Sequence, residues 1–400
     1  MPKNDAPSKR TEPTQPCKVD PVFLNCKKRK AIFFLVLFLS QGVVVSAVYI
    51  GFAVYRSNSL YDYVKSNQLG WKGKIHKFDR ELGFAPIPDS RGDLVFPMGP
   101  NIPIRYDENG FRIPVQKGDA FHKRHPLLLM LGCSFTYGYA TFAKDTWPYL
   151  VGRRLNGSTK NAGFPSYGLC QMLILARKLI PVYQPDFVVV QYSPWLVDRS
   201  ISPFAPAYFG KLPVPYFYQS NHLAIHPPVF QTKITDLPFD RYYTSPKDTS
   251  DYLSFLRHVG FPLFSHDDFN MILYWLKRTF LFLPEPAANQ DDVVRYVYEE
   301  IAKVAGENQT QVVILILGGN YVEIQIPEYL FPHAAIIVNA QRALIERLNV
   351  ANNTNYLKEY AHWRGSPPSI VDTHPNKEAH RIIAEEIVLK IRERDFENQR

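Results

Sequence analysis

The chain has 400 residues, of which 46% are hydrophobic and 14% aromatic, and this composition excludes an intrinsically disordered protein. The formal net charge of +9 is concentrated at one end, because residues 1–30 hold eight Lys or Arg against three acids. No basic stripe is left elsewhere, and we expect no nucleic-acid partner. The four cysteines show no Cys-x-x-Cys or Cys/His spacing, so we expect no metal site and no cofactor.

The first predicted element is a membrane-spanning helix over residues 31–55. This segment has no charged residue. At about 1.5 Å per residue it reaches roughly 37 Å, enough to cross a bilayer core with some tilt. Four consecutive cations precede it and only Arg56 follows closely. The positive-inside rule therefore predicts a cytoplasmic tail over residues 1–30 and a periplasmic, extracytoplasmic location for residues 56–400. Residues 45–47 would suit signal-peptide cleavage, but the apolar run is longer than a signal peptide and continues beyond them, so we expect an uncleaved signal anchor.

A juxtamembrane lead-in covers residues 56–124. Five prolines between positions 86 and 103 exclude a long helix there, and Asn109-Gly110 predicts a tight turn between short strands. We therefore expect a β-rich lead-in that begins with a helical stalk over residues 56–71.

Strands then alternate with helices from residue 125 onward. Short apolar runs predict strands over residues 127–131, 187–191, 312–317 and 334–338. Helices are expected over residues 146–155, 169–180, 341–348 and 376–392, with Thr146 as the cap of the first and Pro181 as the end of the second. This alternation indicates an α/β domain whose parallel sheet is covered by helices on both faces.

An insertion rich in Pro, Tyr and Phe interrupts this pattern at about residues 200–290. It contains two strand-like pieces around residues 220–222 and a strongly apolar helix over 268–282, and we interpret it as a cap on the sheet domain. The alternative for that helix is a helix on the membrane surface. Most aromatic residues of the cap are expected in its own core, and a few between Tyr208 and Tyr218 in a groove for a polymeric substrate.

The candidate nucleophile is Ser134, which follows the strand over 127–131 in the segment Gly132-Cys133-Ser134. Open α/β sheets bind their ligands beyond the carboxyl ends of the strands, where this serine would lie. The alternative is a serine that only satisfies backbone groups in an ordinary turn. A nucleophilic serine needs a base and a group that orients the base, so the remaining chain decides between the two.

His374 is the candidate base among eleven histidines. It lies in the segment Asp372-Thr373-His374-Pro375-Asn376, directly before the last predicted helix. Asp372 is two residues away and can fold back to the imidazole within one turn. The alternative is a histidine in a capping loop.

Together these segments resemble those of the SGNH/GDSL hydrolases. Gly132-Cys133-Ser134-Phe135-Thr136 resembles the nucleophile block, Asn161-Ala162-Gly163 the glycine block and Asp372-Thr373-His374 the C-terminal Asp/His block. The resemblance covers residues 125–396, and the lead-in segment over 109–112 is similar to that of membrane-anchored bacterial members.

This resemblance implies a three-layer α/β/α, flavodoxin-like domain and a serine esterase or acyltransferase mechanism. Ser134 would be the nucleophile, His374 the base and Asp372 its orienting partner. The backbone N–H groups of Ser134 and Gly163 would form the oxyanion hole.

One block departs from the pattern, because the Gly-x-Asn that usually follows the strand over 187–191 is absent. Loss of one oxyanion donor typically costs about 2.7–4 kcal/mol of transition-state stabilisation. Ser193, the Trp195 indole or a backbone amide would have to replace the missing asparagine, unless the enzyme is slow or has lost hydrolysis. Asn320 follows a later strand, and we expect it to have a turn role.

Three functions follow from this interpretation. The first is a membrane-anchored esterase that removes acyl groups from a cell-envelope glycan or lipid. The second is an O-acyltransferase on an exopolysaccharide, as in the alginate O-acetyltransferase branch of the superfamily. The third is a catalytically impaired member that binds glycan.

Overall fold

The computed structural model describes residues 21–67, 70–95, 100–115, 124–205, 212–219, 222–229, 274–280, 283–325 and 327–398. The chain divides into two compact units, Met1–Arg56 and Ser57–Arg400. Helix α1 (Pro21–Asn67) includes the predicted anchor and most of the predicted stalk. Within it, Lys28–Val48 is long and apolar enough to cross a membrane, judged by length and composition.

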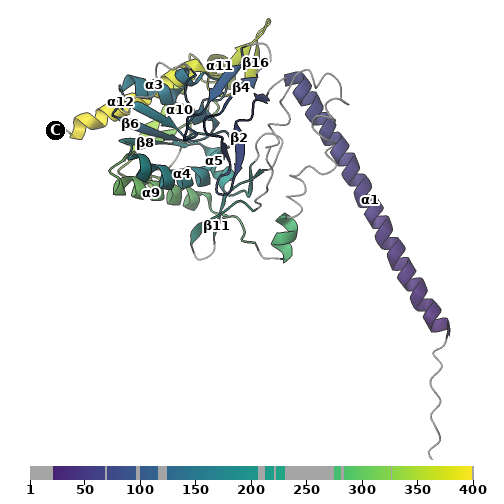
Figure 1. The fold of residues 1–400 in the computed structure, drawn as a ribbon. Coiled ribbons are helices and arrows are strands. Elements are labelled where there is room, and N and C mark those ends of the chain that lie inside the picture. Colours follow the sequence, from purple (N-terminus) through teal and green to yellow (C-terminus); the bar gives the residue numbers. More distant parts are fainter. Residues whose placement is uncertain are drawn as a thin grey trace, which may run out of the picture. The chain divides into compact units, whose positions relative to one another are not determined.

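The centre of the second unit is a five-stranded parallel sheet (Figure 1). Its strands, in spatial order, are β14 (Ile336–Asn339), β13 (Gln311–Ile316), β8 (Phe187–Tyr192), β6 (Leu127–Leu131) and β7 (Ser158–Asn161). Numbered along the chain, this is the order 2-1-3-4-5 of flavodoxin-like sheets. The central strands are almost continuously apolar because both faces of the sheet are covered. The predicted parallel sheet is confirmed.

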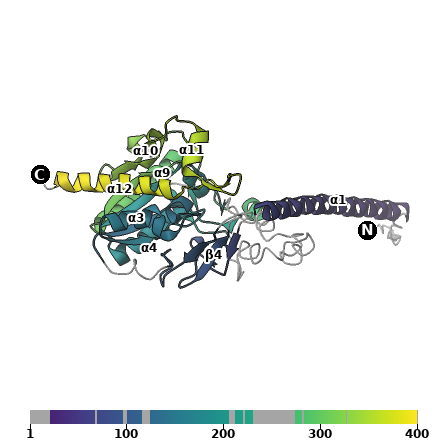
Figure 2. The ribbon, with the colours of Figure 1, turned by 90° about the horizontal axis from the view of Figure 1, so that it is seen from above.

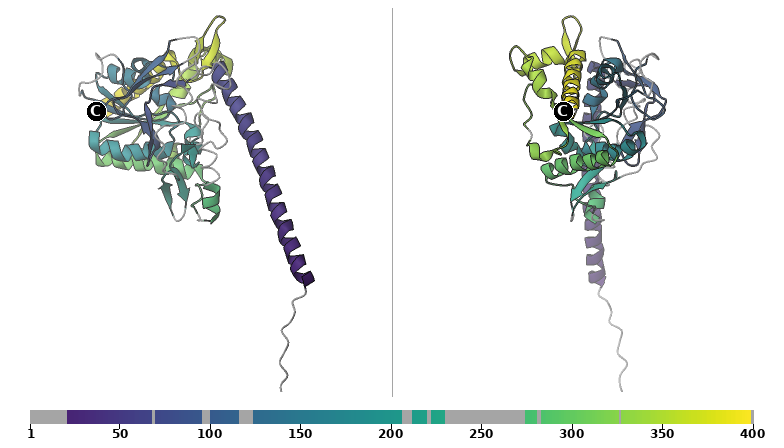
Figure 3. Two further views of the ribbon diagram at one scale, coloured as in Figure 1. Left: turned by 45° about the vertical axis from the view of Figure 1, so that its right-hand side comes forward. Right: turned by 90° about the vertical axis from the view of Figure 1, so that its left-hand side faces the viewer.

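Helices cover both faces of the sheet, as the views in Figure 1 and Figure 3 show. One layer contains α3 (Trp147–Arg154), α10 (Ala340–Glu346), α11 (Asn353–Tyr360) and α12 (Lys377–Asn398). The other contains α4 (Leu169–Tyr183), α5 (Pro194–Ser200) and α9 (Gln290–Glu307). Helix α12 packs against both α3 and α10 (Figure 2), and its Ile383 and Ile387 are fully buried. The three-layer α/β/α fold is therefore confirmed.

Several elements differ from the sequence prediction, among them α9, α11, β15 (His362–Arg364) and β16 (Ser369–Asp372), which were not predicted. Strand β7 was not predicted, because Ser158-Thr159-Lys160-Asn161 is a polar edge strand without an apolar run. Helix α4 continues past Pro181 to Tyr183, since a proline in the last turn removes only one internal hydrogen bond. The residue that caps its end is Gln184, which has a left-handed backbone with φ of 45°. Helix α12 extends to Asn398, six residues beyond the predicted end.

The lead-in contains five short strands. A three-stranded antiparallel sheet and a hairpin contain β1 (Gly70–Lys72), β2 (His76–Asp79), β3 (Gly83–Pro86), β4 (Arg91–Val95) and β5 (Ile102–Arg105). Their apolar side chains form a second core with Tyr137, Phe164 and Tyr167 of the α/β domain. The Tyr167 hydroxyl also donates to the carbonyl of Phe84 at 2.8 Å. The lead-in therefore packs against the segments that follow β6 and β7.

The insertion contains the predicted hairpin, with β11 (Tyr216–Gln219) paired to β12 (Leu223–His226). Tyr216 and Phe217 are fully buried, and Phe217 belongs to the main core. These two aromatic residues therefore lie in the core, where most aromatic residues of the cap are expected, and neither of them lines a groove. Of the helix predicted over 268–282, residues 274–280 are helical; 268–273 and 281–282 lie outside the described residues, as do Tyr208 and Phe209.

Candidate active site

The candidate nucleophile lies where the strand order of the sheet reverses. Two residues separate the end of β6 from helix α2 (Ser134–Tyr137), and β7 and β8 pair with opposite edges of β6. Doubly wound sheets bind their ligands at this switch point. The backbone requires glycine before the serine, because a Cβ on Gly132 would lie 1.9 Å from the hydroxyl oxygen of Thr136. The fold therefore places Ser134 at the usual location of an α/β active site.

A buried amide holds this turn against the neighbouring strand. Gln191 in β8 has no exposed surface, and its Oε1 accepts from the Thr136 hydroxyl at 2.7 Å and from the Cys133 N–H at 3.2 Å. Its Nε2 donates to the Ser193 hydroxyl at 2.8 Å. We did not identify Gln191 from the sequence. The available signal was a lone polar side chain in a run of Val residues.

The predicted glycine block lies on the other side of α2. Asn161 ends β7, and its side-chain amide donates to the carbonyl of Thr136 at 3.1 Å. A Cβ on Gly163 would lie 2.8 Å from the backbone nitrogen of Tyr137, so only glycine fits this close approach. The N–H of Gly163 donates to Oδ1 of Asn161 at 3.0 Å. The structure thus brings Gly163 beside α2, with its N–H already hydrogen-bonded.

Asp372 and His374 form the predicted pair. Asp372 is the last residue of β16 (Ser369–Asp372), and His374 lies between that strand and α12. One carboxylate oxygen, Oδ1, accepts the backbone N–H of His374 at 2.7 Å and lies 2.8 Å from its Nδ1. A proton on Nδ1 satisfies this contact, which leaves Nε2 as the acceptor of the imidazole. Burial alone raises the pKa of Asp372, but the charge and hydrogen bonds of His374 bring the net pKa below its ordinary value.

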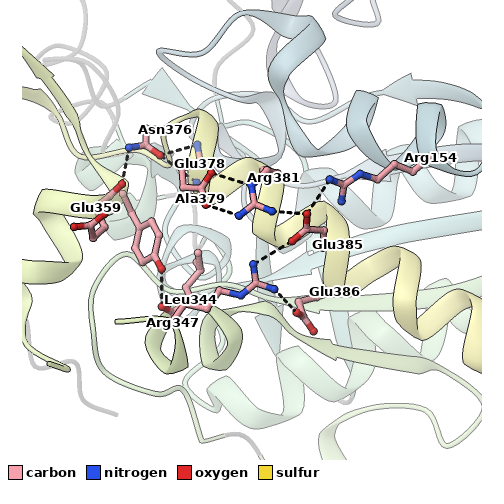
Figure 4. A network of polar contacts seen from close by, with 11 residues as sticks. Arg154, Leu344, Arg347, Glu359, Asn376, Glu378, Ala379, Arg381, Glu385 and Glu386 are labelled. Atoms are coloured by element: carbon pink, nitrogen blue, oxygen red, sulfur yellow. Dashed lines mark hydrogen bonds and ion pairs between the residues drawn. The ribbon is translucent and has the colours of Figure 1, made fainter. Parts of the chain in front are cut away.

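Two further contacts fix the loop that carries His374. Oδ1 of Asn376 accepts the N–H groups of Glu378 and Ala379 at 3.0 and 3.1 Å and so caps α12, as Figure 4 shows. His362 in β15 (His362–Arg364) pairs with Asp372 across the two strands, and its Nε2 lies 3.2 Å from the carbonyl oxygen of Pro375. Burial lowers the pKa of His362, which favours the neutral ring there.

The loop with His374 packs onto the segment that begins at Ser134. The His374 ring lies 5.4 Å from the ring of Phe135 and 4.6 Å from the ring of Tyr139, measured between centroids. Within the described part of the chain, no hydrogen bond joins Ser134 to His374. The structure thus brings the two segments together and leaves the serine–histidine hydrogen bond unformed.

The residues proposed to replace the missing asparagine differ in their availability. The Ser193 hydroxyl accepts from Gln191 and donates to the carbonyl of Leu317 at 2.6 Å. Its proton is therefore already used in a hydrogen bond within the protein. Asn320 has the expected turn role, since its Oδ1 accepts the N–H of Val322 at 3.0 Å. The indole nitrogen of Trp195 is buried and has no hydrogen-bond partner among the described residues. Of these three side chains, Trp195 is the one with an unused donor.

A buried arginine from the lead-in supports the same region. The Arg112 guanidinium donates to the carbonyls of Tyr137, Gly138 and Thr141 at 2.5, 2.7 and 2.7 Å. It also lies 4.3 Å above the ring of Tyr137. Burial lowers the pKa of Arg112. The segment over 109–112, noted in the sequence for its resemblance, therefore holds the end of α2 and the turn after it.

No protein-family model and no curated protein matches the chain. Solved structures that match include an acetylxylan esterase from Geobacillus stearothermophilus, with 11% identity, a TM-score of 0.33 and coverage of 68% of this chain and 95% of that one. A GDSL-like lipase from Bacteroides thetaiotaomicron has 10% identity, a TM-score of 0.31 and coverage of 67% and 88%. A carbohydrate esterase of family 2 from Corynascus thermopiles has 11% identity, a TM-score of 0.30 and coverage of 75% and 72%.

At these identities and TM-scores, function does not follow from the matches, and it has to come from the residues of this chain. Ser134 follows the first parallel strand, Gly163 follows the second, and Asp372 is hydrogen-bonded to His374 before the last helix. In the order and sheet positions of these segments, the chain resembles the SGNH/GDSL hydrolases.

Proposed function

We propose that this protein is a serine esterase of SGNH type in which Ser134 is the nucleophile, His374 the general base and Asp372 the group that orients the base. The observation that carries the proposal is the 2.8 Å contact between Asp372 Oδ1 and His374 Nδ1, in a loop packed against the residue after Ser134. This contact directs the basic Nε2 away from the carboxylate and makes it available to a hydroxyl. Serine–histidine hydrogen bonds are often long before substrate binds, so their absence in the free protein agrees with this role.

The oxyanion of the tetrahedral intermediate would be bound by the backbone N–H groups of Ser134 and Gly163. The Ser134 N–H donates to no acceptor among the described residues and is therefore available. The Gly163 N–H now donates to Oδ1 of Asn161. To bind the oxyanion, it must leave this acceptor or donate to both acceptors at once. The unpartnered indole N–H of Trp195 is our candidate for the third donor, and it requires a side-chain rotation because the atom is now buried. Such a site predicts slow hydrolysis.

A catalytically impaired, glycan-binding protein is the second candidate. It is favoured by the same two observations, the absent asparagine and the hydrogen-bonded N–H of Gly163. An O-acyltransferase on an exopolysaccharide uses the same serine, base and oxyanion site, and differs only in whether a sugar hydroxyl or water attacks the acyl-enzyme.

The substrate we propose is an acyl ester of a cell-envelope glycan or lipid. The reason is location: residues 31–55 would anchor the chain in the membrane with its N-terminus in the cytoplasm and the catalytic domain in the periplasm. Protease added to spheroplasts should then digest residues 56–400 and spare the tail. Protection of the large domain would contradict this topology.

A fluorophosphonate probe tests the nucleophile directly. We expect labelling of Ser134 in the wild type, and loss of labelling in Ser134→Ala and His374→Ala. The matched controls, Ser202→Ala and His333→Ala, change a serine and a histidine outside the candidate site and should label as the wild type does. Labelling that persists in His374→Ala would show that the base is misassigned. Complete absence of labelling in the wild type would favour the impaired protein.

Turnover of a small acyl ester separates the roles within the triad. Ser134→Ala and His374→Ala should each abolish turnover, because nucleophile and base act as a unit. Asp372→Asn should keep residual activity, because the orienting carboxylate is partly dispensable. Transfer of the acyl group to an added oligosaccharide in place of water would identify the acyltransferase.

A further inference from the structure

A pocket lies beside the loop that carries His374. It has a volume of about 770 Å³, and its walls are residues 140–145, the last turn of α3, strand β15 and the first turns of α12. Two of its walls continue directly from the candidate active site. Thr141 follows Tyr139, whose ring packs on His374, and the Thr141 hydroxyl donates to the carbonyl of Pro375 at 3.2 Å. The pocket is therefore connected through these contacts to the loop that carries the candidate base.

The pocket is positively charged. Five cationic side chains line it against two carboxylates, and they are Arg153, Arg154, Arg364, Lys377 and Arg381 against Asp145 and Glu378. Arg154 and Arg381 are committed to the ion-pair network around Glu385 that Figure 4 shows. Arg153, in the last turn of α3, forms no ion pair within the described residues and is exposed. A cationic group thus remains for an anionic ligand.

Flat aromatic surface lies next to these cations. Trp363 in β15 is 41% exposed, and its indole N–H donates to the carbonyl of Leu357 at 2.8 Å, which fixes the ring. Phe142, which also lines the pocket, is 37% exposed. Phe142 and Asp145 also line an adjoining pocket of about 380 Å³, so the two pockets share a wall. Rigid aromatic rings lose little entropy on binding and present the flat contact that a sugar ring fits.

We infer that this pocket binds an anionic sugar unit, one that carries a carboxylate, of the polymer whose acyl ester reaches Ser134. The inference rests on the proposed function for the identity of the polymer, while the pocket itself stands on its own residues. Arg153 would pair with the carboxylate through charge-assisted hydrogen bonds, and Trp363 would contact the ring. The protein would then select acidic over neutral glycans.

Binding is measured by calorimetry on the full chain in detergent. Every protein tested carries the Ser134→Ala substitution, which prevents turnover. The probes are uronic-acid trisaccharides of gluco, galacto and manno configuration, their neutral counterparts, and inorganic phosphate. We expect at least one acidic trisaccharide to saturate the protein where its neutral counterpart does not. Affinity should fall about tenfold in Arg153→Glu, and it should also fall as salt is raised.

The matched control is Lys303→Glu, which makes the same charge change on α9, in the other helix layer, and should leave binding unchanged. Trp363→Ala should weaken the acidic trisaccharide without changing the response to phosphate. Thermal unfolding shows whether each variant is folded. If Arg153→Glu does not fold, Arg153→Gln replaces it as a milder change. Equal binding of acidic and neutral sugars, equal effects of Arg153→Glu and Lys303→Glu, or binding of phosphate alone would overturn the inference. Failure of the probe to label Ser134 would overturn only the esterase.

Discussion

Thr136 and Gln191 are joined by a buried hydrogen bond of 2.7 Å, which links the helix that begins at Ser134 to strand β8. The same amide accepts the Cys133 N–H and donates to the Ser193 hydroxyl. A single side chain therefore holds the nucleophile turn and the segment where the asparagine is missing.

Gln191→Ala should destabilise the protein by at least about 2 kcal/mol, because it leaves several buried polar groups without a partner. It should also lower kcat for a small ester more than it raises KM, since the turn that carries Ser134 loses its support. Urea unfolding and steady-state kinetics measure both effects. Gln311→Ala is the control on β13, where the amide is only half-buried and donates to the carbonyl of Ala334 at 2.9 Å. Equal effects of the two substitutions would contradict the role of Gln191.

Gly132→Ala should destabilise the protein by about 1–3 kcal/mol through overpacking, because its Cβ would lie 1.9 Å from the Thr136 hydroxyl oxygen and 2.7 Å from Oε1 of Gln191. Labelling of Ser134 should fall with it. Gly306→Ala is the matched control, since no atom lies within 4 Å of the position its Cβ would take. That change in α9 should be neutral or stabilise by up to about 1 kcal/mol. Unfolding by urea gives both values, and a tolerated Gly132→Ala would show that the turn has more room than we describe.

Arg112→Lys should cost about 3 kcal/mol, because a lysine cannot span the carbonyls of Tyr137 and Thr141 that the guanidinium joins. The expected functional result is a lower kcat, since these carbonyls border the residue that packs on His374. Arg295→Lys is the control, in an exposed pair with Asp292 at 2.9 Å, and should cost less than about 1 kcal/mol. If a folded Arg112→Lys protein kept the wild-type kcat, the contacts that Arg112 makes from the lead-in would have no role in catalysis.

Folding stability should fall as the pH drops below about 6.5, because His380 is fully buried and burial holds its pKa well below the ordinary value. The unfolded chain binds a proton below that pH and the folded one does not, so the stabilisation is complete above about pH 6.5 and is lost toward the lower folded pKa. Through this one group, the free energy of unfolding should change by up to about 1.4 kcal/mol per pH unit.

The test compares urea midpoints at pH 7.5 and 5.5 in wild type, His380→Gln and the exposed control His333→Gln. In the wild type, the backbone N–H of Trp147 donates to Nδ1 of His380 at 3.2 Å. A glutamine at position 380 keeps an acceptor for this N–H. His380→Gln should lose less stability between the two pH values than wild type, and His333→Gln should behave as wild type. Identical pH dependence in all three would contradict this prediction, because it would show that the pKa of His380 is the same in the folded and unfolded chains.

Much of the fold was predictable because its signals are local. The run from Leu127 to Leu131 is uniformly apolar since both faces of the strand are covered, and the predicted bounds agree with β6. Strand β7 was missed for the opposite reason: Ser158 to Asn161 lie at the sheet edge, where burial imposes no apolar pattern. The buried positions of Tyr216 and Phe217 also depend on residues far away in the sequence. One of these is Tyr296, whose ring centroid lies 5.9 Å from that of Phe217.

The sequence by itself determined the parallel sheet, the candidate Ser134 at the end of its first strand, and the pairing of Asp372 with His374, which lie two residues apart. Only the tertiary structure decided what surrounds them. Gln191 is 55 residues from Thr136, and Arg112 is 25 from Tyr137. Such contacts depend on how β8 and the lead-in pack against the nucleophile segment, and no local pattern of residue types encodes them. Gly163 illustrates the difference: the sequence predicts its position, and only the folded turn shows that its N–H already has an acceptor.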